Sequence, residues 1–294
     1  MDPDAHTGIE TGNGKHFLIP EAGVRKASAA MRLKESQSTY KEQLMESLKG
    51  MRAIITGAAQ GMGKGIALYL ASCGVDIAIC DLKEDTLEKT AEEIRLKTGQ
   101  QVIAQALDIT QEEAVKEFVA EILSTFGEID ILVNNAGIHP LKPIEEIEGD
   151  EWDLVFAVNV KASFYFCKAV LPAMRERKFG RIINISSEAG KNGGTVAALH
   201  YAASKGAVLA FVRNLAQQVG ADGITVNAIA PGRIMTAMSS AVSPEENQKF
   251  IDNSITKSLG TPEDIAYAVG YLASREASFV TAETMMVNGG TLRD

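Results

Sequence analysis

The chain has 294 residues, of which 46% are hydrophobic and 23% charged, and its formal net charge at pH 7 is −9. This composition is typical of a globular protein with a substantial core. The absence of a Lys/Arg-rich run argues against a nucleic-acid partner, and the absence of a run of about 18 apolar residues argues against a membrane span.

The N-terminal residues and the cysteines favour a cytoplasmic protein. The first residues include Asp2 and Asp4 and lack an apolar segment, so no secretory signal is expected. Cys73, Cys80 and Cys167 are odd in number and widely spaced. We therefore expect them to be reduced and buried, with no role in a disulfide or a metal site. No HExxH motif or clustered Cys/His set predicts a metal site elsewhere.

Residues 1–50 differ from the rest of the chain. They contain seven Lys/Arg and seven Asp/Glu, so the net charge of −9 comes from residues 51–294. Residues 22–48 have a composition that favours a helix. We expect an N-terminal extension over 1–50, partly helical or disordered, and a single catalytic domain over 51–294. A regulatory or partner-binding role for the extension stays open.

After Gly50, short apolar runs alternate with helical patterns. The predicted strands are 51–56, 76–81, 102–107, 130–134, 181–186, 224–229 and 284–288. The predicted helices are 63–73, 84–97, 111–126, 151–177, 202–219 and 262–273. Strands that are apolar almost throughout are typical of a parallel sheet buried on both faces. The alternation therefore predicts an α/β fold, a doubly wound parallel seven-stranded sheet with helices on both faces.

A glycine-rich segment, TGAAQGMG (56–63), joins the first predicted strand to the first predicted helix. Gly57, Gly61 and Gly63 allow the backbone to turn sharply and to approach a pyrophosphate closely. The start of the following helix offers unpaired N–H groups and the positive end of its dipole. This position, between a strand and a helix, predicts a dinucleotide site.

Two carboxylates end the next two strands. Asp81 can accept hydrogen bonds from both hydroxyls of the adenosine ribose and would repel a 2′-phosphate. No arginine follows it, and Gln60 stands where a basic residue could have bound that phosphate. Both features favour NAD over NADP. Asp108 closes the third strand, and the sequence leaves open whether it contacts the adenine or only supports its loop.

Several motifs together resemble the short-chain dehydrogenase/reductase family over residues 51–290. They occur in the family's order: TGAAQGMG (56–63), Asp81, Asp108, NNAG (134–137), Asn159, Ser187, YAASK (201–205) and PGRIMT (231–236). The resemblance implies a Rossmann-like fold, a nicotinamide cofactor and catalysis by Asn159, Ser187, Tyr201 and Lys205. It also implies that the apolar helix around 160–171 belongs to the core or to a subunit contact, with a homotetramer as the expected assembly and a dimer as the alternative.

Tyr201 is the general acid/base that the resemblance implies, and elementary chemistry agrees. Lys205 lies four residues later, on the same helix face, and a nearby cation lowers the pKa of a phenol from its usual ~10. Ser187 would hydrogen-bond the reacting oxygen of the substrate, with the adjacent Ser186 as its rival. By resemblance, Asn159 holds a water that relays the proton beside Lys205.

The cofactor contacts follow the same motifs. The candidate residues are Gly57, Gln60, Gly61, Met62, Gly63, Asp81, Leu82, Asp108, Ile109, Asn135, Ala136, Gly137, Tyr201, Lys205, Pro231, Gly232, Ile234 and Thr236. The resemblance implies that the Ile234 backbone pairs with the nicotinamide carboxamide. It also implies that Thr236 contacts the carboxamide or the phosphates. Residues 235–259 form a candidate lid, which includes Met238 and Val242.

The expected function is an NAD(H)-dependent oxidoreductase that moves a hydride between nicotinamide and a secondary alcohol or ketone. Two alternatives remain: an NADPH-dependent 3-oxoacyl thioester reductase, and a cofactor-binding sensor or scaffold without turnover. The substrate is expected to be a small alcohol or ketone, and the sequence does not identify it.

Overall fold

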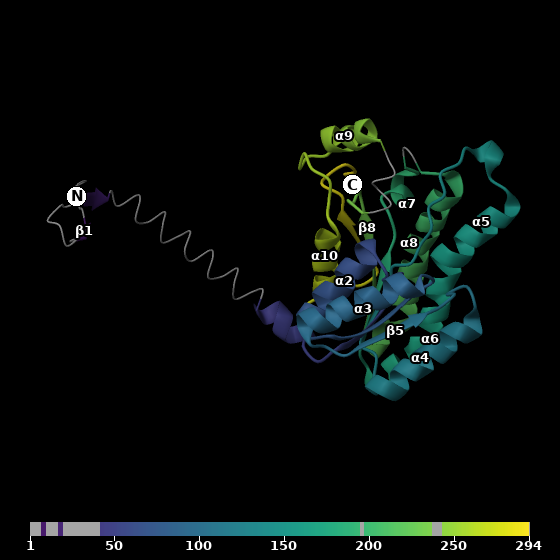
Figure 1. The fold of residues 1–294 in the computed structure, drawn as a ribbon, viewed down its shortest axis with the longest axis horizontal. Coiled ribbons are helices and arrows are strands. Elements are labelled where there is room, and N and C mark those ends of the chain that lie inside the picture. The colour runs from purple at the N-terminus through teal and green to yellow at the C-terminus, as the bar shows by residue number, and fades with distance from the viewer. Residues whose placement is uncertain (1–6, 10–16, 20–41, 195–196, 237–242, 294) are drawn as a thin grey trace. The chain divides into compact units, whose positions relative to one another are not determined.

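The computed structural model describes residues 7–9, 17–19, 42–194, 197–236 and 243–293 (Figure 1). Its contacts divide the chain into two units, Met1–Met45 and Glu46–Asp294. In the first unit, β1 (Thr7–Ile9) and β2 (Phe17–Ile19) pair in antiparallel register, a hairpin that the sequence did not predict. Residues 42–48 are helical, as predicted, and most of the remaining predicted helix lies outside the described residues.

The second unit contains one sheet of seven strands. They are β3 (Arg52–Thr56), β4 (Asp76–Asp81), β5 (Val102–Ala106), β6 (Ile131–Asn134), β7 (Gly180–Ile185), β8 (Ile224–Pro231) and β9 (Thr284–Val287). Their order is β5-β4-β3-β6-β7-β8-β9, and every neighbouring pair is parallel. The predicted fold is confirmed, and each predicted strand is found within about two residues of its expected ends.

Helices cover both faces of this sheet (Figure 1). One face carries α2 (Gly61–Ser72), α3 (Glu84–Thr98) and α10 (Pro262–Ala273), which pack on one another. The other carries α4 (Glu112–Phe126), α6 (Ala162–Arg177) and α8 (Leu199–Val219). The strands are buried on both faces, which explains why their sequences are apolar throughout.

Helix ends carry the expected chemical signals. Helices α3 and α4 begin with acidic residues and end at Gly99 and Gly127, both in the left-handed conformation. Helix α10 begins with a capping box in which Thr261 and Asp264 each bond the other's backbone N–H, with a proline at its first position. These local signals fix the helix boundaries and hence the lengths of the loops at the sheet's edge.

The predicted helix over 151–177 is interrupted. It consists of α5 (Gly149–Phe156), a π-helical turn, η2 (Ala157–Lys161), and α6. The whole segment Gly149–Arg177 is long and apolar enough to cross a membrane by length and composition, with a mean hydropathy of 1.5 over its best window. The sequence contains no run of about 18 apolar residues, and the expectation that the chain does not span a membrane stays a prediction. Contacts of α6 with α4, β6 and β7 account for this hydropathy within the fold.

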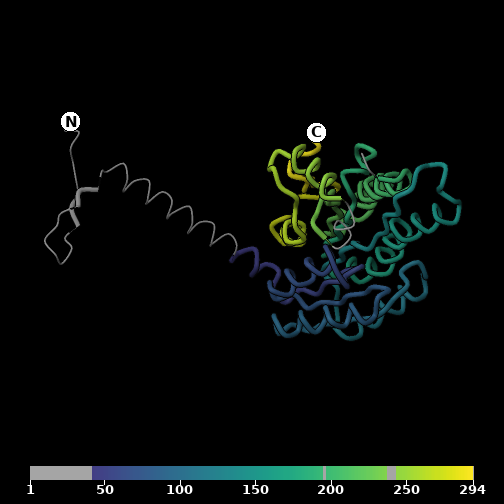
Figure 2. Tube along the Cα trace, turned by 45° about the horizontal axis from the view of Figure 1, so that its top comes forward, coloured from purple at the N-terminus to yellow at the C-terminus, as the bar shows by residue number. Residues whose placement is uncertain are grey.

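Four further short elements went unpredicted. They are η1 (Ile144–Glu146), α7 (Ala189–Asn192), η3 (Gly220–Asp222) and α9 (Pro244–Asn253). In addition, α2 begins two residues and α8 three residues earlier than expected. The C-terminal segment, yellow in Figure 2, runs beside residues 255–256, whose two backbone N–H groups both donate to Gly289 O (2.8 and 3.2 Å). Cys73, Cys80 and Cys167 are buried thiols, as expected.

Candidate active site

The candidate site lies where the strand order reverses. Strand β3 is flanked by β4 on one side and by β6 on the other, and the chain leaves β3 and β6 toward opposite faces of the sheet. Open parallel sheets bind ligands in the crevice outside the carboxyl ends of their strands at such a point. The predicted glycine loop, the NNAG segment and Ser187 all follow strands of this sheet directly.

The glycine loop is packed too closely to admit side chains. Gly57 has a φ of +65°, and a Cβ there would lie 2.7 Å from the Cα of Ala136. A Cβ on Gly63 would lie 2.3 Å from the backbone oxygen of Gly57. Gly61 is the first residue of α2 and follows Gln60, the N-cap. The loop thus presents bare backbone and the start of a 12-residue helix to the crevice, a cradle suited to a pyrophosphate.

The Asp81 carboxylate is fixed beside this loop. Its Oδ2 accepts a hydrogen bond from Ala59 N (3.1 Å), and its Oδ1 accepts one from Lys83 N (3.2 Å). A carboxylate has about four lone-pair sites, so these two bonds orient the group and leave it able to accept from a diol. Leu82, the next residue, is 71% exposed.

Asp108 has a structural role that the sequence left open. Its carboxylate accepts hydrogen bonds from the backbone N–H and the hydroxyl of Thr110 (2.9 and 2.7 Å). These bonds, the hydroxyl's first, hold the pKa of the Asp108 carboxyl below its ordinary value. The group is exposed and shapes the turn before α4, whereas its neighbour Ile109 is buried.

Asn135 braces the glycine loop. Its side-chain amide donates to the backbone oxygens of Thr56 (2.9 Å) and Gly57 (3.0 Å). The backbone N–H groups of Asn135 and Ala136 both donate to the Thr56 hydroxyl. The family resemblance implies that the NNAG amides lie against the adenosine side of the cofactor and stabilise the centre of the sheet. The observed bonds join the ends of β3 and β6, which are neighbours at that centre. The cofactor contact stays a prediction.

Ser187 and Tyr201 are brought together, and Ser186 is directed elsewhere. The Ser187 hydroxyl lies beside the Tyr201 phenol and lowers its pKa by hydrogen bonding. The Ser186 hydroxyl is buried and donates to Lys205 O (2.8 Å), which anchors α8 to the end of β7. The two serines that sequence reasoning had to choose between therefore have separate tasks, one in the site and one in the scaffold.

Lys205 and Asn159 lie behind the phenol. The Lys205 ammonium is buried, donates to Ile185 O (2.9 Å) and lies 5.8 Å from the centre of the Tyr201 ring. Asn159, within the π-helical turn, accepts from Ile138 N (2.8 Å) and donates to the Ser204 hydroxyl (3.0 Å). A Cβ on Gly137 would lie within 3.3 Å of both side chains, so all three residues are neighbours.

The pKa shifts of Tyr201 and Lys205 differ from the expectation. Burial raises the pKa of Tyr201, and the Ser187 hydrogen bond lowers it only partly. Burial lowers the pKa of Lys205 to about 8. We expected the ammonium to bring the phenol toward neutrality. Instead desolvation is the larger effect, because both groups lie in a dry environment and the ammonium faces a carbonyl oxygen.

A cavity of about 220 Å³ opens in front of Tyr201 and Ser187. Besides Tyr201, five predicted cofactor residues line it: Met62, Pro231, Gly232, Ile234 and Thr236. Ile234 and Gly260 form a parallel β-bridge. The bonds of this bridge are made by the residues on either side of Ile234: Gly260 N donates to Arg233 O, and Met235 N donates to Gly260 O. The N–H and C=O of Ile234 itself therefore point to the opposite side, as pairing with a carboxamide requires.

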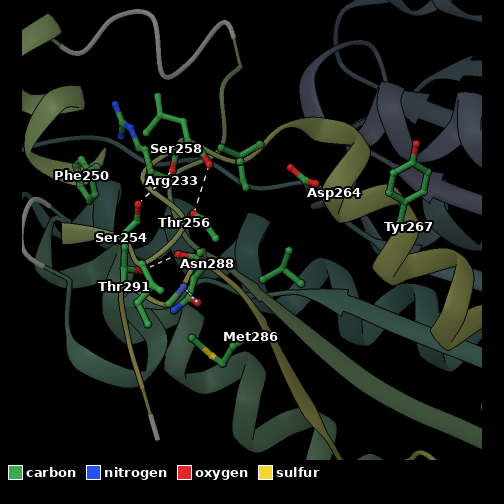
Figure 3. A pocket seen from close by; sticks show the side chains of 17 residues that line it. Arg233, Phe250, Ser254, Thr256, Ser258, Asp264, Tyr267, Met286, Asn288 and Thr291 are labelled. Carbon is green, nitrogen blue, oxygen red and sulfur yellow. Dashed lines mark hydrogen bonds between the residues drawn. The ribbon is translucent and has the colours of Figure 1, made fainter. Parts of the chain in front are cut away.

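A second, larger cavity of about 650 Å³ lies beside the first and contains none of the four predicted catalytic residues (Figure 3). Arg233 and Phe250 border both cavities, with the guanidinium 5.2 Å from the ring centre. Figure 3 shows Asn288 and Thr291 of the C-terminal segment on one side of it and Asp264 and Tyr267 of α10 on the other. Of the predicted lid, Met238 and Val242 lie outside the described residues.

Sequence reasoning missed three polar residues around the smaller cavity. His139 and Glu188 line it, and the Glu188 carboxylate accepts from the Thr291 hydroxyl (2.5 Å). His200, fully buried beside Tyr201, lies 3.2 Å from the Glu151 carboxylate through its Nε2. In the sequence, only two positions could have indicated these residues: His139 closely follows NNAG, and His200 directly precedes Tyr201.

The residues present fit a dinucleotide carrying a nicotinamide. The bare glycine loop meets the N-terminus of α2, and a fixed carboxylate stands where a ribose would lie. The Tyr201 hydroxyl lies at the other end of the crevice, beside the cavity. Fold and site together define a nicotinamide-dependent oxidoreductase of the Rossmann type.

Comparison with known proteins agrees with this class. A family profile described as enoyl-(acyl carrier protein) reductase matches residues 57–291. The chain belongs to the short-chain dehydrogenase/reductase family. It is 37% identical to the 3-oxoacyl-(acyl-carrier-protein) reductase FabG of Haemophilus influenzae over 83% of this chain and 98% of that protein. It is 39% identical to the short-chain dehydrogenase/reductase eriH of Hericium erinaceus, over 84% and 99%.

A solved structure is similar throughout the catalytic domain. An Agrobacterium tumefaciens protein, provisionally named a gluconate dehydrogenase, superimposes with a TM-score of 0.81 at 29% identity. The match covers 85% of this chain and 99% of that one. A match over 85% of this chain is about as long as the second unit, which contains the seven-stranded sheet and its helices.

Proposed function

We propose that the protein is an NAD(H)-dependent oxidoreductase acting on a secondary alcohol or ketone. The observation that carries the proposal is the grouping of Tyr201, Ser187 and Lys205 at the mouth of the dinucleotide crevice. The phenol and the serine hydroxyl are close enough for Ser187 to lower the pKa of the phenol, and both line the cavity that a small substrate would enter.

In this mechanism the protein handles the proton. When bound, the nicotinamide supplies or takes up the hydride. The Tyr201 hydroxyl donates a proton to the carbonyl oxygen of a ketone, and the Ser187 hydroxyl steadies the charge that develops on that oxygen. The raised pKa of Tyr201 keeps the phenol protonated at neutral pH, the form that can donate this proton. Asn159 and Lys205 stand behind the phenol, where we propose that a water relay restores its proton.

The preference for NAD rests on Asp81. Because two backbone N–H groups fix its carboxylate, the negative charge cannot swing away from a cofactor's adenosine ribose. A 2′-phosphate placed there would meet a like charge at short range, whereas two ribose hydroxyls would donate to it.

A second candidate is an NADPH-dependent 3-oxoacyl thioester reductase, which the name of the FabG relatives favours. Asp81 argues against it, because its fixed carboxylate would repel the 2′-phosphate of NADPH. A third candidate, a cofactor-binding sensor without turnover, leaves the Tyr201–Ser187 pair without a purpose.

The test compares kcat/KM for NAD(H) and NADP(H), with a panel of secondary alcohols and ketones, in three proteins. Wild type should prefer NAD(H). Asp81→Asn should relax that preference by roughly 10-fold or more, because it removes the charge and keeps an oxygen for Ala59 N. Asp76→Asn, at the opposite end of β4, is the matched control and should keep the wild-type ratio. A wild-type preference for NADP(H) would overturn the assignment.

A further inference from the structure

His139 is the one imidazole that lines the smaller cavity among the described residues. Its ring stacks on the ring of Tyr201, with centres 3.9 Å apart and planes inclined by 30°. Its Nε2 is buried and has no hydrogen-bond partner among the described residues. A buried polar nitrogen without a partner costs free energy, which indicates that a ligand completes this group when the site is filled.

The imidazole is neutral at working pH. Burial first, and then the positive charges of Arg233 and Lys205, lower the pKa of His139 to about 4. The ring therefore neither titrates with Tyr201 nor competes with it for the transferred proton. A neutral imidazole can donate through one nitrogen and accept through the other, so it can recognise a hydroxyl or a carbonyl oxygen without carrying charge into the cavity.

The position of the ring limits which substrate atom it can meet. His139 follows β6 and Ser187 follows β7, so the two residues reach the cavity from neighbouring strands. The reacting oxygen must lie within hydrogen-bond reach of Tyr201 and Ser187. The imidazole packs against the Tyr201 ring and lines the same cavity, so a substrate whose reacting oxygen is held by Tyr201 lies beside it.

We propose that His139 determines specificity by hydrogen-bonding a second oxygen of the substrate, a hydroxyl or carbonyl one or two carbons from the reacting carbon. This inference rests on the proposed function and deepens it. The preferred substrates are small diols, hydroxyketones or dicarbonyl compounds, in keeping with a cavity of about 220 Å³. A site that hydrogen-bonds a substrate oxygen discriminates strongly against the analogue that lacks it.

The test uses two pairs of probes, 2,3-butanediol with 2-butanol and trans-1,2-cyclohexanediol with cyclohexanol, each with NAD and with NADP. Wild type should give a higher kcat/KM for the diol of at least one pair. His139→Phe keeps a ring to stack on Tyr201 and removes the polar edge. It should lower kcat/KM for that diol by about 10–100-fold, mainly through KM, and change the mono-alcohol by less than about 3-fold.

His139→Gln is the conservative variant, since it restores a donor and an acceptor and should recover part of the diol preference. If His139 has a purely structural role, His139→Phe should lower kcat/KM for the diol and for the mono-alcohol equally, and that result would overturn the inference. So would a wild type that oxidises mono-alcohols and gains nothing from the second oxygen, although the proposed function would then stand. If wild type turns over none of the four alcohols with either cofactor, both this inference and the proposed function are overturned.

Discussion

Lys205 carries a charge that the proposed function needs in a buried position that disfavours charge. Its ammonium has little access to water, donates to a backbone carbonyl and lies beside the phenol of Tyr201. Transferring a charge to such a place costs free energy, which appears as a pKa of about 8. The protein tolerates this cost at a position that orients a proton donor, as is common for perturbed groups in active sites.

This burial predicts a pH-dependent stability. A lysine in the unfolded chain keeps its proton to about pH 10.4, whereas folded Lys205 loses it near pH 8. Between these values the unfolded chain binds more protons, so this group's contribution to wild-type stability rises with pH. The free energy of unfolding of Lys205→Met minus that of wild type should therefore fall by about 2 kcal/mol from pH 7 to pH 10.

Urea unfolding of both proteins at the two pH values measures this difference. Lys116→Met is the control, because Lys116 is exposed and its carboxylate neighbours raise its pKa above the ordinary value. It should show no such change over this range. A Lys205→Met difference that stays constant between pH 7 and pH 10 would contradict a buried, destabilised ammonium.

The sequence identified Tyr201, Lys205, Ser187 and Asn159 because each stands in a motif with a fixed position on a strand end or a helix. It did not predict how strongly burial acts on Tyr201 and Lys205, since the depth of a side chain depends on elements distant in sequence. His139 was missed for a related reason. A histidine in a loop carries no periodic signal, and only the fold stacks it on Tyr201.

At the scale of elements, the seven strands were predictable because strands buried on both faces must be apolar throughout. The π-helical turn η2 was not, because its sequence continues the pattern of the helices on either side. That turn holds Asn159, and such turns frequently occur at functional sites. Helix α9 has a capping box at Ser243 and Glu246, a signal that sequence reasoning overlooked within a segment treated as a lid.

The glycine loop gives a prediction at this scale. Gly63→Ala places a Cβ 2.3 Å from the oxygen of Gly57 and 2.6 Å from the amide nitrogen of Asn135. The loop must move or break its brace, so we expect a loss of about 1–3 kcal/mol in stability and much weaker NADH binding. Thermal unfolding and NADH fluorescence measure both effects. Gly149→Ala, where no atom lies within 4 Å of the new Cβ, should change neither.

At the scale of the whole molecule, an apolar groove between α6 and α8 remains accessible. A cavity of about 350 Å³ there is lined by Phe164, Leu171, Phe211 and Leu215, among others. Phe164 is 46% exposed, and exposed aromatic patches of this kind often mark subunit contacts. We propose that this face joins copies of the chain in a homotetramer.

Light scattering at micromolar concentration tests the assembly. Wild type should be a tetramer, with a dimer as the smaller assembly compatible with this face. Phe164→Glu should lower the measured mass, because assembly would bury an unpaired charge at the subunit contact. Leu96→Glu, an exposed apolar residue of α3, is the matched control and should keep the wild-type mass. A monomeric wild type would leave the aromatic groove unexplained and contradict the proposal.

The central claim is that Tyr201 transfers the proton in a nicotinamide-dependent oxidoreductase. Tyr201→Phe removes one oxygen and leaves the ring on His139, so folding and NADH affinity should be preserved. The most direct measurement is kcat for the best alcohol or ketone found, in wild type, Tyr201→Phe and the control Tyr267→Phe. We expect Tyr201→Phe to lose about 10²–10⁴-fold in kcat and the control to retain wild-type turnover. A Tyr201→Phe enzyme that binds NADH normally and keeps more than about a tenth of wild-type kcat would contradict the claim.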